Sequence, residues 1–158
     1  MSSMVPPSAS IEMSSDIPGA TCALSYALDI SSIIQSVNDD GAGANVHFIG
    51  TTRNSFQGKV VTRLEYQAYS KLAIKTMTEI VHAAFENFKL IRCAIHHRLG
   101  TVEVGQPSIV VAVSAPHRKE AFRACEYILE EVKRKAQIWK REYYEGEDED
   151  AAEWKSNA

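Results

Sequence analysis

The chain has 158 residues and a formal net charge of −3 at pH 7, with both signs of charge well represented. This length fits one globular domain. The balanced charge provides neither the overall basic surface of a nucleic-acid-binding protein nor the polybasic segment of a membrane-surface protein. Cys22, Cys93 and Cys125 are far apart and form no CxxC pair. Their spacing argues against a disulfide framework or a structural zinc site and favours a reducing compartment.

The N-terminal segment is polar, with six serines and three prolines in the first twenty residues and no Lys or Arg before Arg53. Secretory signals and mitochondrial transit peptides need basic residues. A membrane-spanning helix needs about 20 apolar residues, and no run approaches that length. We therefore expect a soluble, cytosolic protein with a disordered tail over residues 1–22, one domain over 23–145 and an acidic tail over 146–158.

Hydrophobic periodicity predicts the elements of the first half of the domain. A short amphipathic helix is indicated by the helical spacing of Ile30, Ile33, Ile34 and Val37. It is expected to end at residues 38–41, Asn-Asp-Asp-Gly, because these residue types commonly terminate helices. A strand is expected over 46–51, and a second over 60–69, where alternate positions are apolar. Ser70 then caps a long helix whose apolar stripe extends to residue 88.

The second half has the same kind of alternation. Strands are expected over Ile91–His97 and Ser108–Ser114, and the unbroken apolar run of the latter indicates burial on both faces. A long helix follows over 116–135, then a strand over Ile138–Tyr143 and an irregular acidic stretch over Glu145–Glu153. This order predicts an α+β domain, with a mixed sheet and two long helices on one face.

A candidate anion site lies where the buried strand runs into the second long helix, at Ser114-Ala115-Pro116-His117-Arg118. Free N–H groups and the helix dipole favour an anion at a helix N-terminus, and His117 and Arg118 would add charged hydrogen bonds. The alternative is an ordinary serine cap with proline in the first turn and two solvated side chains.

A basic segment from Lys133 to Arg141 joins this helix to the last strand. Lys133 follows Leu129 by one turn, at the border of the apolar face, so partial desolvation could lower the pKa of its ammonium. Lys140 lies on the strand, on the side opposite Trp139. The two lysines could converge on one pocket, or they could form a solvated helix end that complements the dipole.

Cationic groups also stand at two strand ends, Arg53 in Gly50-Thr51-Thr52-Arg53-Asn54 and Arg98 after His97. Strand ends commonly carry ligand-binding loops, although each cation alone is more often a surface charge. His96 and His97 would point to opposite faces of a strand and make a poor metal pair. The sequence has no Walker A, GxGxxG, GxSxG or HExxH motif, so it offers no common nucleotide, hydrolase or zinc signature.

Five motifs, in order and at similar spacing, resemble the molybdopterin synthase large-subunit (MoaE) family of eukaryotic type, over about residues 23–145. The motifs are Phe48-Ile49-Gly50-Thr51-Thr52-Arg53-Asn54, Leu64-Glu65-Tyr66-Gln67-Ala68-Tyr69, His97-Arg98-Leu99-Gly100, Val113-Ser114-Ala115-Pro116-His117-Arg118 and Ile138-Trp139-Lys140-Arg141-Glu142. The later Trp154-Lys155-Ser156-Asn157 also resembles eukaryotic members.

The resemblance implies an α/β hammerhead-like domain that forms a homodimer within a heterotetramer. Each large subunit would bind a small ubiquitin-like subunit whose C-terminal Gly-Gly thiocarboxylate donates sulfur to cyclic pyranopterin monophosphate, with no metal or cofactor on this chain. It implies that Lys133 and Lys140 are the catalytic lysines, and that Arg53, His117 and Arg118 bind the substrate phosphate together with the lysines. Arg98 is a further substrate-binding candidate.

One departure from the family pattern is Gln137, which stands where the family usually has proline before the Trp-Lys segment. This substitution and the polar extensions favour an alternative, a non-catalytic adaptor that binds a ubiquitin-like partner. A generic phosphometabolite enzyme, active without any protein partner, is a third possibility.

Overall fold

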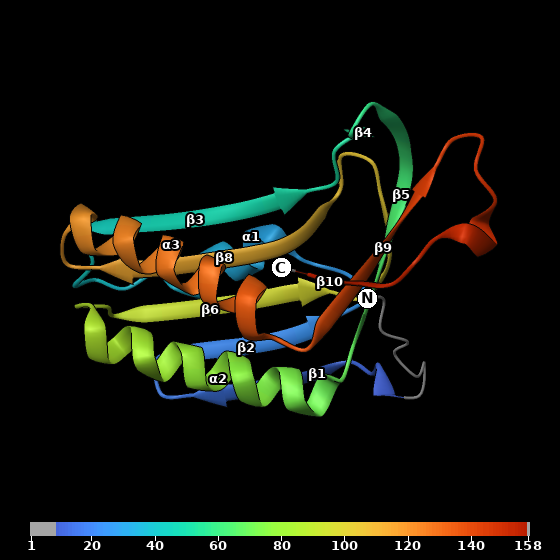
Figure 1. Ribbon diagram of the computed structural model, residues 1–158. Helices are drawn as coiled ribbons and strands as arrows, with labels where there is room; N and C mark the ends of the chain where they lie inside the picture. The colour runs from blue at the N-terminus through green and yellow to red at the C-terminus, as the bar shows by residue number, and fades with distance from the viewer. Residues whose placement is uncertain (1–8, 158) are drawn as a thin grey trace.

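The computed structural model describes residues 9–157, which form two β-sheets and three α-helices (Figure 1). The first sheet contains, in spatial order, β1 (Met13–Ile17), β2 (Ala20–Ser25), β6 (Arg92–Arg98), β8 (Pro107–Ala115) and β3 (Ala44–Thr51). The second contains β10 (Lys155–Ser156), β9 (Ile138–Tyr144), β5 (Lys59–Ala68) and β4 (Ser55–Phe56), with β7 (Gly100–Glu103) also paired to β5. The helices are α1 (Ile30–Gln35), α2 (Ser70–Asn87) and α3 (Arg118–Lys135).

The first sheet is mixed, since β2 and β6 run parallel while its other pairs are antiparallel. The expected α+β class and the two long helices are therefore confirmed. No helix in residues 9–157 is both long and apolar enough to cross a lipid bilayer.

The first sheet is covered on both faces. The helices α2 and α3 lie side by side over one face (Figure 1), and Cys93 and Ile95 of β6 point into the main core beneath them. Ala94 and Val110 point the other way and pack with Ile33 of α1 in a second, smaller core. This explains the unbroken apolar run of β8. The two long helices share one face, as expected, and the short helix α1 covers the other.

The second sheet stands at one end of the first and is steeply inclined to it (Figure 1). β5 and β9 pair in antiparallel fashion, with Tyr66 opposite Lys140. Leu64, Tyr66 and Ile138 extend the main core into this sheet. Because α3 runs almost directly into β9, the last turn of α3 and one face of β9 border the same space.

The N-terminal segment is ordered further upstream than composition suggested. β1 and β2 form a hairpin around Gly19, whose φ of +78° suits glycine, and β2 then pairs with β6. The disordered tail expected over residues 1–22 was therefore wrong for 13–22, while residues 1–8 lie outside the described part. Cys22 and Leu24 are buried in the core, and long-range pairing with β6 outweighs a serine-rich composition.

The C-terminal segment also belongs to the domain. The acidic stretch is mostly irregular, with one 3₁₀ turn at Glu149–Ala151. Trp154 is then buried, and β10 pairs with β9. The expected tail boundary at 146 therefore does not mark the end of the packed structure.

The start of α2 differs from expectation, and the middle of α2 contacts the α3–β9 connection. The helix begins at Ser70, with Tyr69 at the N-cap, and the Ser70 hydroxyl donates to the Ile11 carbonyl (2.6 Å) instead of capping the helix. Gln137 accepts a hydrogen bond from the Thr76 hydroxyl (2.9 Å). Gln137 thus ties the α3–β9 connection to α2.

Candidate active site

A cavity of about 500 Å³ lies at the junction of the two sheets. The end of β3, the β4–β5 hairpin, β9 and the last turn of α3 form its walls. Three of the six cations expected from the sequence line it: Arg53, Lys133 and Lys140. Their convergence makes the cavity suitable for an anionic ligand.

Lys133 differs from the other cations of its segment. Arg134 and Lys135 both pair with Glu131, an interaction that holds them on the outer side of the helix. Within residues 9–157, no carboxylate forms an ion pair with Lys133. Burial lowers the pKa of the Lys133 ammonium, and the positive charge of Lys140 lowers it further. Lys133 is thus a half-buried amine that releases its proton more readily than an ordinary lysine.

Lys140 projects from β9 on the face opposite Trp139, as expected. Its side chain is 25% exposed, and its ammonium lies 3.9 Å from the Glu142 carboxylate. Glu142 also accepts a hydrogen bond from Tyr144 (2.7 Å). This arrangement holds Lys140 at the cavity as a charged group.

Tyr66 also lines the cavity, and the sequence reasoning did not single it out as a site residue. The Tyr66 hydroxyl is hydrogen bonded to Ser108, and burial raises the pKa of Tyr66. The ring of His97 stands edge-on to Tyr66, with centroids 4.8 Å apart. Tyr66 lies in one of the five motifs, and its inward position on an alternating strand was the available signal.

Arg53 lies at the mouth of the cavity. Its Nε donates to the Ser55 carbonyl (3.1 Å), which folds the side chain back along the β4–β5 hairpin. The end of the guanidinium forms no ion pair within the described residues. Arg53 can therefore meet an anion entering beside Phe56, which also lines the mouth.

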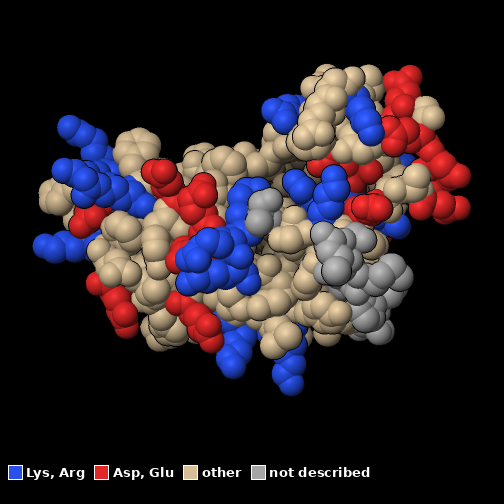
Figure 2. All heavy atoms as spheres, viewed as in Figure 1, with Lys and Arg blue, Asp and Glu red and all other residues tan. Residues whose placement is uncertain are grey.

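His117 and Arg118 lie far from this cavity. His117 is the N-cap of α3 and Arg118 its first residue, whereas Lys133 is in the last turn. Fifteen residues separate Arg118 from Lys133, which at 1.5 Å per residue corresponds to about 22 Å. Basic side chains gather over this end of α3 in Figure 2. One chain therefore does not unite the expected phosphate clamp with the two lysines.

Arg98 is not brought to the cavity either. It is hydrogen bonded to the Gln106 side chain (2.9 Å). It shares the strand face of Ala94, under α1, while His97 points to the cavity side. Strand alternation thus directs Arg98 away from the position expected for a substrate-binding residue.

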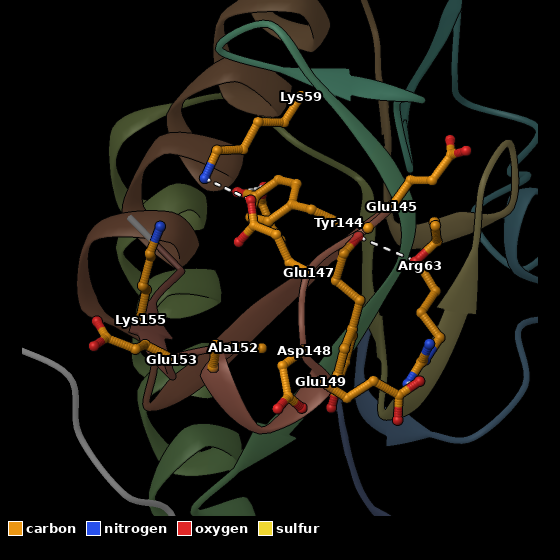
Figure 3. Close-up of a pocket in the computed structure, with 15 residues that line it drawn as sticks. Lys59, Arg63, Tyr144, Glu145, Glu147, Asp148, Glu149, Ala152, Glu153 and Lys155 are labelled. Atoms are coloured by element: carbon orange, nitrogen blue, oxygen red, sulfur yellow. Dashed lines mark hydrogen bonds and ion pairs between the residues drawn. The ribbon is translucent and has the colours of Figure 1, made fainter.

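A second cavity, of about 480 Å³, lies between β5, β9 and the acidic stretch (Figure 3). Two of its cations form ion pairs: Lys59 with Glu147 (2.9 Å) and Arg63 with Glu149 (3.0 Å). Six carboxylates and only three cations line it. This excess of negative charge disfavours an anionic substrate, so the first cavity is the better candidate.

Comparison with known proteins identifies the fold family. A family model described as "MoaE protein" matches residues 25–135. The chain belongs to the MoaE family. A relative from Coccidioides immitis, named molybdopterin synthase catalytic subunit, is 46% identical over 132 residues, covering 84% of this chain and 67% of its own.

Solved structures agree with this family assignment. The molybdopterin synthase structure from Staphylococcus aureus superposes with a TM-score of 0.74 and 32% identity, over 81% of this chain and 90% of that one. A Helicobacter pylori structure, described as a complex of subunits 1 and 2 of molybdopterin-converting factor, shares the fold with a TM-score of 0.65 and 23% identity. It covers 81% of this chain and 86% of its own.

Proposed function

We propose that this chain is the catalytic subunit of a molybdopterin synthase, a sulfurtransferase that moves two sulfurs to cyclic pyranopterin monophosphate. The donor is the thiocarboxylated C-terminus of a ubiquitin-like small subunit. The observation that carries this proposal is Lys133, a half-buried amine without a carboxylate partner among the described residues, in one cavity with Lys140 and Arg53. The family assignment and the names of the relatives support it.

Each cation has a physical role in this reaction. The reactants are both anionic, a thiocarboxylate and a phosphate, so a cavity bordered by three cations lowers the cost of bringing them together. Lys133 as an ammonium stabilises negative charge that develops on the thiocarboxyl group. Its lowered pKa also moves its proton exchange toward neutral pH, which suits general acid–base catalysis.

Lys140 acts through charge. It remains paired with Glu142 at the cavity wall, and its positive charge lowers the pKa of Lys133. Lys133 is therefore the principal catalytic group in this proposal, and Lys140 is the residue that tunes it and contacts the anionic reactants.

The phosphate clamp requires a second copy of the chain. A separation of about 22 Å along α3 is too long for one pterin monophosphate to contact both Arg118 and Lys133 of the same subunit. We therefore assign His117 and Arg118 to the cavity of a partner subunit in a homodimer, the core of a heterotetramer with two small subunits. The exposed Phe48 and Phe122, on β3 and α3, provide apolar surface suited to such an interface.

A cytosolic location is part of the proposal. Cys22, Cys93 and Cys125 are free thiols, as a reducing compartment requires. Burial raises the pKa of each thiol, so none is suited to act as a nucleophile in sulfur transfer.

The test is conversion of cyclic pyranopterin monophosphate by the purified chain and thiocarboxylated small subunit. We expect Lys133→Ala to reduce the rate by at least about 100-fold, as loss of a general acid–base group does. Lys135→Ala is the matched control, since Lys135 pairs with Glu131 outside the cavity. Equal rates for the two variants would remove the basis of the assignment.

Two arms of the same assay address the alternatives. A non-catalytic adaptor would bind the small subunit without converting the pterin. A generic phosphometabolite enzyme would act with the small subunit omitted. The proposed synthase needs both components.

A further inference from the structure

Tyr66 brings an uncharged polar group into the cavity, beside the two lysines. It lies on β5, directly opposite Lys140 of β9, and it lines the same cavity as Lys133. Residues directly opposite one another in an antiparallel pair share a face of the sheet, with Cβ atoms about 4.5–5.5 Å apart. The phenol and the two lysine side chains therefore border one space, although Tyr66 is only 5% exposed.

The ring of Tyr66 is held in place by a fixed neighbour. His97 stands edge-on to it, with centroids 4.8 Å apart. Both nitrogens of His97 are engaged, one with the Arg98 carbonyl (2.8 Å) and the other with the Asn157 amide nitrogen (3.2 Å). A ring packed against such a neighbour keeps its hydroxyl at one position, which is what a catalytic hydrogen-bond donor requires.

The hydrogen of the Tyr66 hydroxyl is available to a ligand. Burial raises the pKa of Tyr66, so the phenol keeps its proton at neutral pH. The hydrogen bond with Ser108 lowers the same pKa, which is the effect of a donor to the phenol oxygen. The Ser108 hydroxyl is also 3.4 Å from the Gly50 carbonyl, a long contact that competes weakly for its hydrogen. When Ser108 donates to the phenol oxygen, the hydrogen of Tyr66 is free to point into the cavity.

Sulfur transfer contains a step that needs such a donor. Once the thiocarboxylate sulfur has bonded to the pterin, it is still bonded to the acyl carbon of the partner's terminus. Water adds to that carbon and gives one proton to the Lys133 amine, while the C=O electron pair moves onto oxygen. When this pair returns, the carbon–sulfur bond breaks, the sulfur leaves with its electrons as a pterin thiolate, and the partner keeps a carboxyl group. A fixed neutral donor and the new ammonium together stabilise the intermediate oxyanion.

We propose that the Tyr66 hydroxyl is the hydrogen-bond donor to this acyl oxyanion, and that it acts in the release of sulfur from the partner. The inference rests on the proposed function, because sulfur transfer supplies the oxyanion. Lys133 provides charge and proton transfer, and Tyr66 provides a neutral donor at a fixed position. Ser108 is a positioning residue, because it acts by directing the phenol hydrogen into the cavity.

The test is single turnover by Tyr66→Phe, which removes the hydroxyl and keeps the packed ring. Loss of one oxyanion donor slows the chemical step by about 100- to 1,000-fold. We expect this loss in the rate of release, with wild-type affinities for the small subunit and for the cyclic pterin. Intact mass should then show a covalent adduct of small subunit and pterin, because the sulfur has bonded to the pterin but has not left the acyl carbon.

Tyr69→Phe is the matched control. The ring of Tyr69 packs edge-on against Trp139, with centroids 5.2 Å apart, on the sheet face opposite the cavity. This variant should convert the pterin at the wild-type rate without an adduct. Ser108→Ala, a second variant, keeps the phenol in place and should slow release by a smaller factor with the same adduct. Thermal unfolding verifies that each variant folds.

Two results would overturn the inference. The first is conversion by Tyr66→Phe at the wild-type rate. The second is slow conversion by Tyr66→Phe and Ser108→Ala without an adduct, because the hydroxyl would then act before the sulfur bonds to the pterin or would only support the fold.

The proposed function and the inference fail separately. If wild type does not convert the pterin with thiocarboxylated small subunit, both fall. If wild type converts the pterin and Tyr66→Phe behaves as Tyr69→Phe does, only the inference falls.

Discussion

A site shared between two copies of the chain predicts recovery of activity in a mixed dimer. Lys133→Ala and Arg118→Ala each remove a group from opposite ends of α3, about 22 Å apart. In a dimer with one copy of each variant, one cavity combines both defects, and the other combines the intact Lys133 of one copy with the intact Arg118 of its partner. We therefore expect about half of the wild-type rate, although each parent homodimer is nearly inactive.

The assay uses co-expression with two different affinity tags, so that tandem purification isolates the mixed dimer, followed by conversion of the cyclic pterin with thiocarboxylated small subunit. The control is a mixed dimer of Lys133→Ala and Lys140→Ala. Both of these residues line the cavity of their own chain, so neither cavity is intact and no recovery is expected. A Lys133–Arg118 mixed dimer no more active than this control would refute the shared site.

Three further predictions follow from the electrostatics of the cavity. Lys140→Met removes the charge that lowers the pKa of Lys133, so the pH profile of turnover should move to higher pH, whereas Lys135→Met should leave it in place. For His97, the folded-state pKa of about 4 lies below the unfolded value of 6.5, so the unfolded chain binds the proton first as pH falls. Stability should therefore fall by about 3 kcal/mol between pH 7 and 4, and less in His97→Gln, as measured by denaturant unfolding. Arg53→Ala should weaken pterin binding by about 10-fold or more while leaving the affinity for the small subunit unchanged; equal losses would indicate a structural role.

Most of the fold was predictable because the sequence periodicity is local. The unbroken apolar run of β8 indicated burial on both faces, and α1 and α3 provide those two covers. β1 and β2 were missed because their stability comes from pairing with β6, about 70 residues away, which no local window contains. β10 was missed for the same reason.

The site was predictable in part. The border position of Lys133 on its helix indicated a desolvated amine, but only tertiary contacts show that Glu131 engages Arg134 and Lys135 and leaves Lys133 to the cavity. Strand alternation could have separated Arg98 from His97. Helix rise alone could have shown that the start of the helix, at Arg118, lies too far from its end to share a site within one chain.

Single turnover of cyclic pyranopterin monophosphate tests the central claim most directly, with the mass of the small partner protein measured before and after to follow its terminal sulfur. The account predicts that wild type converts the pterin to its dithiolene while oxygen replaces sulfur at the terminus of the partner, and that Lys133→Ala, folded and still bound to the partner, leaves the thiocarboxylate intact. Loss of sulfur at the wild-type rate in Lys133→Ala would contradict it.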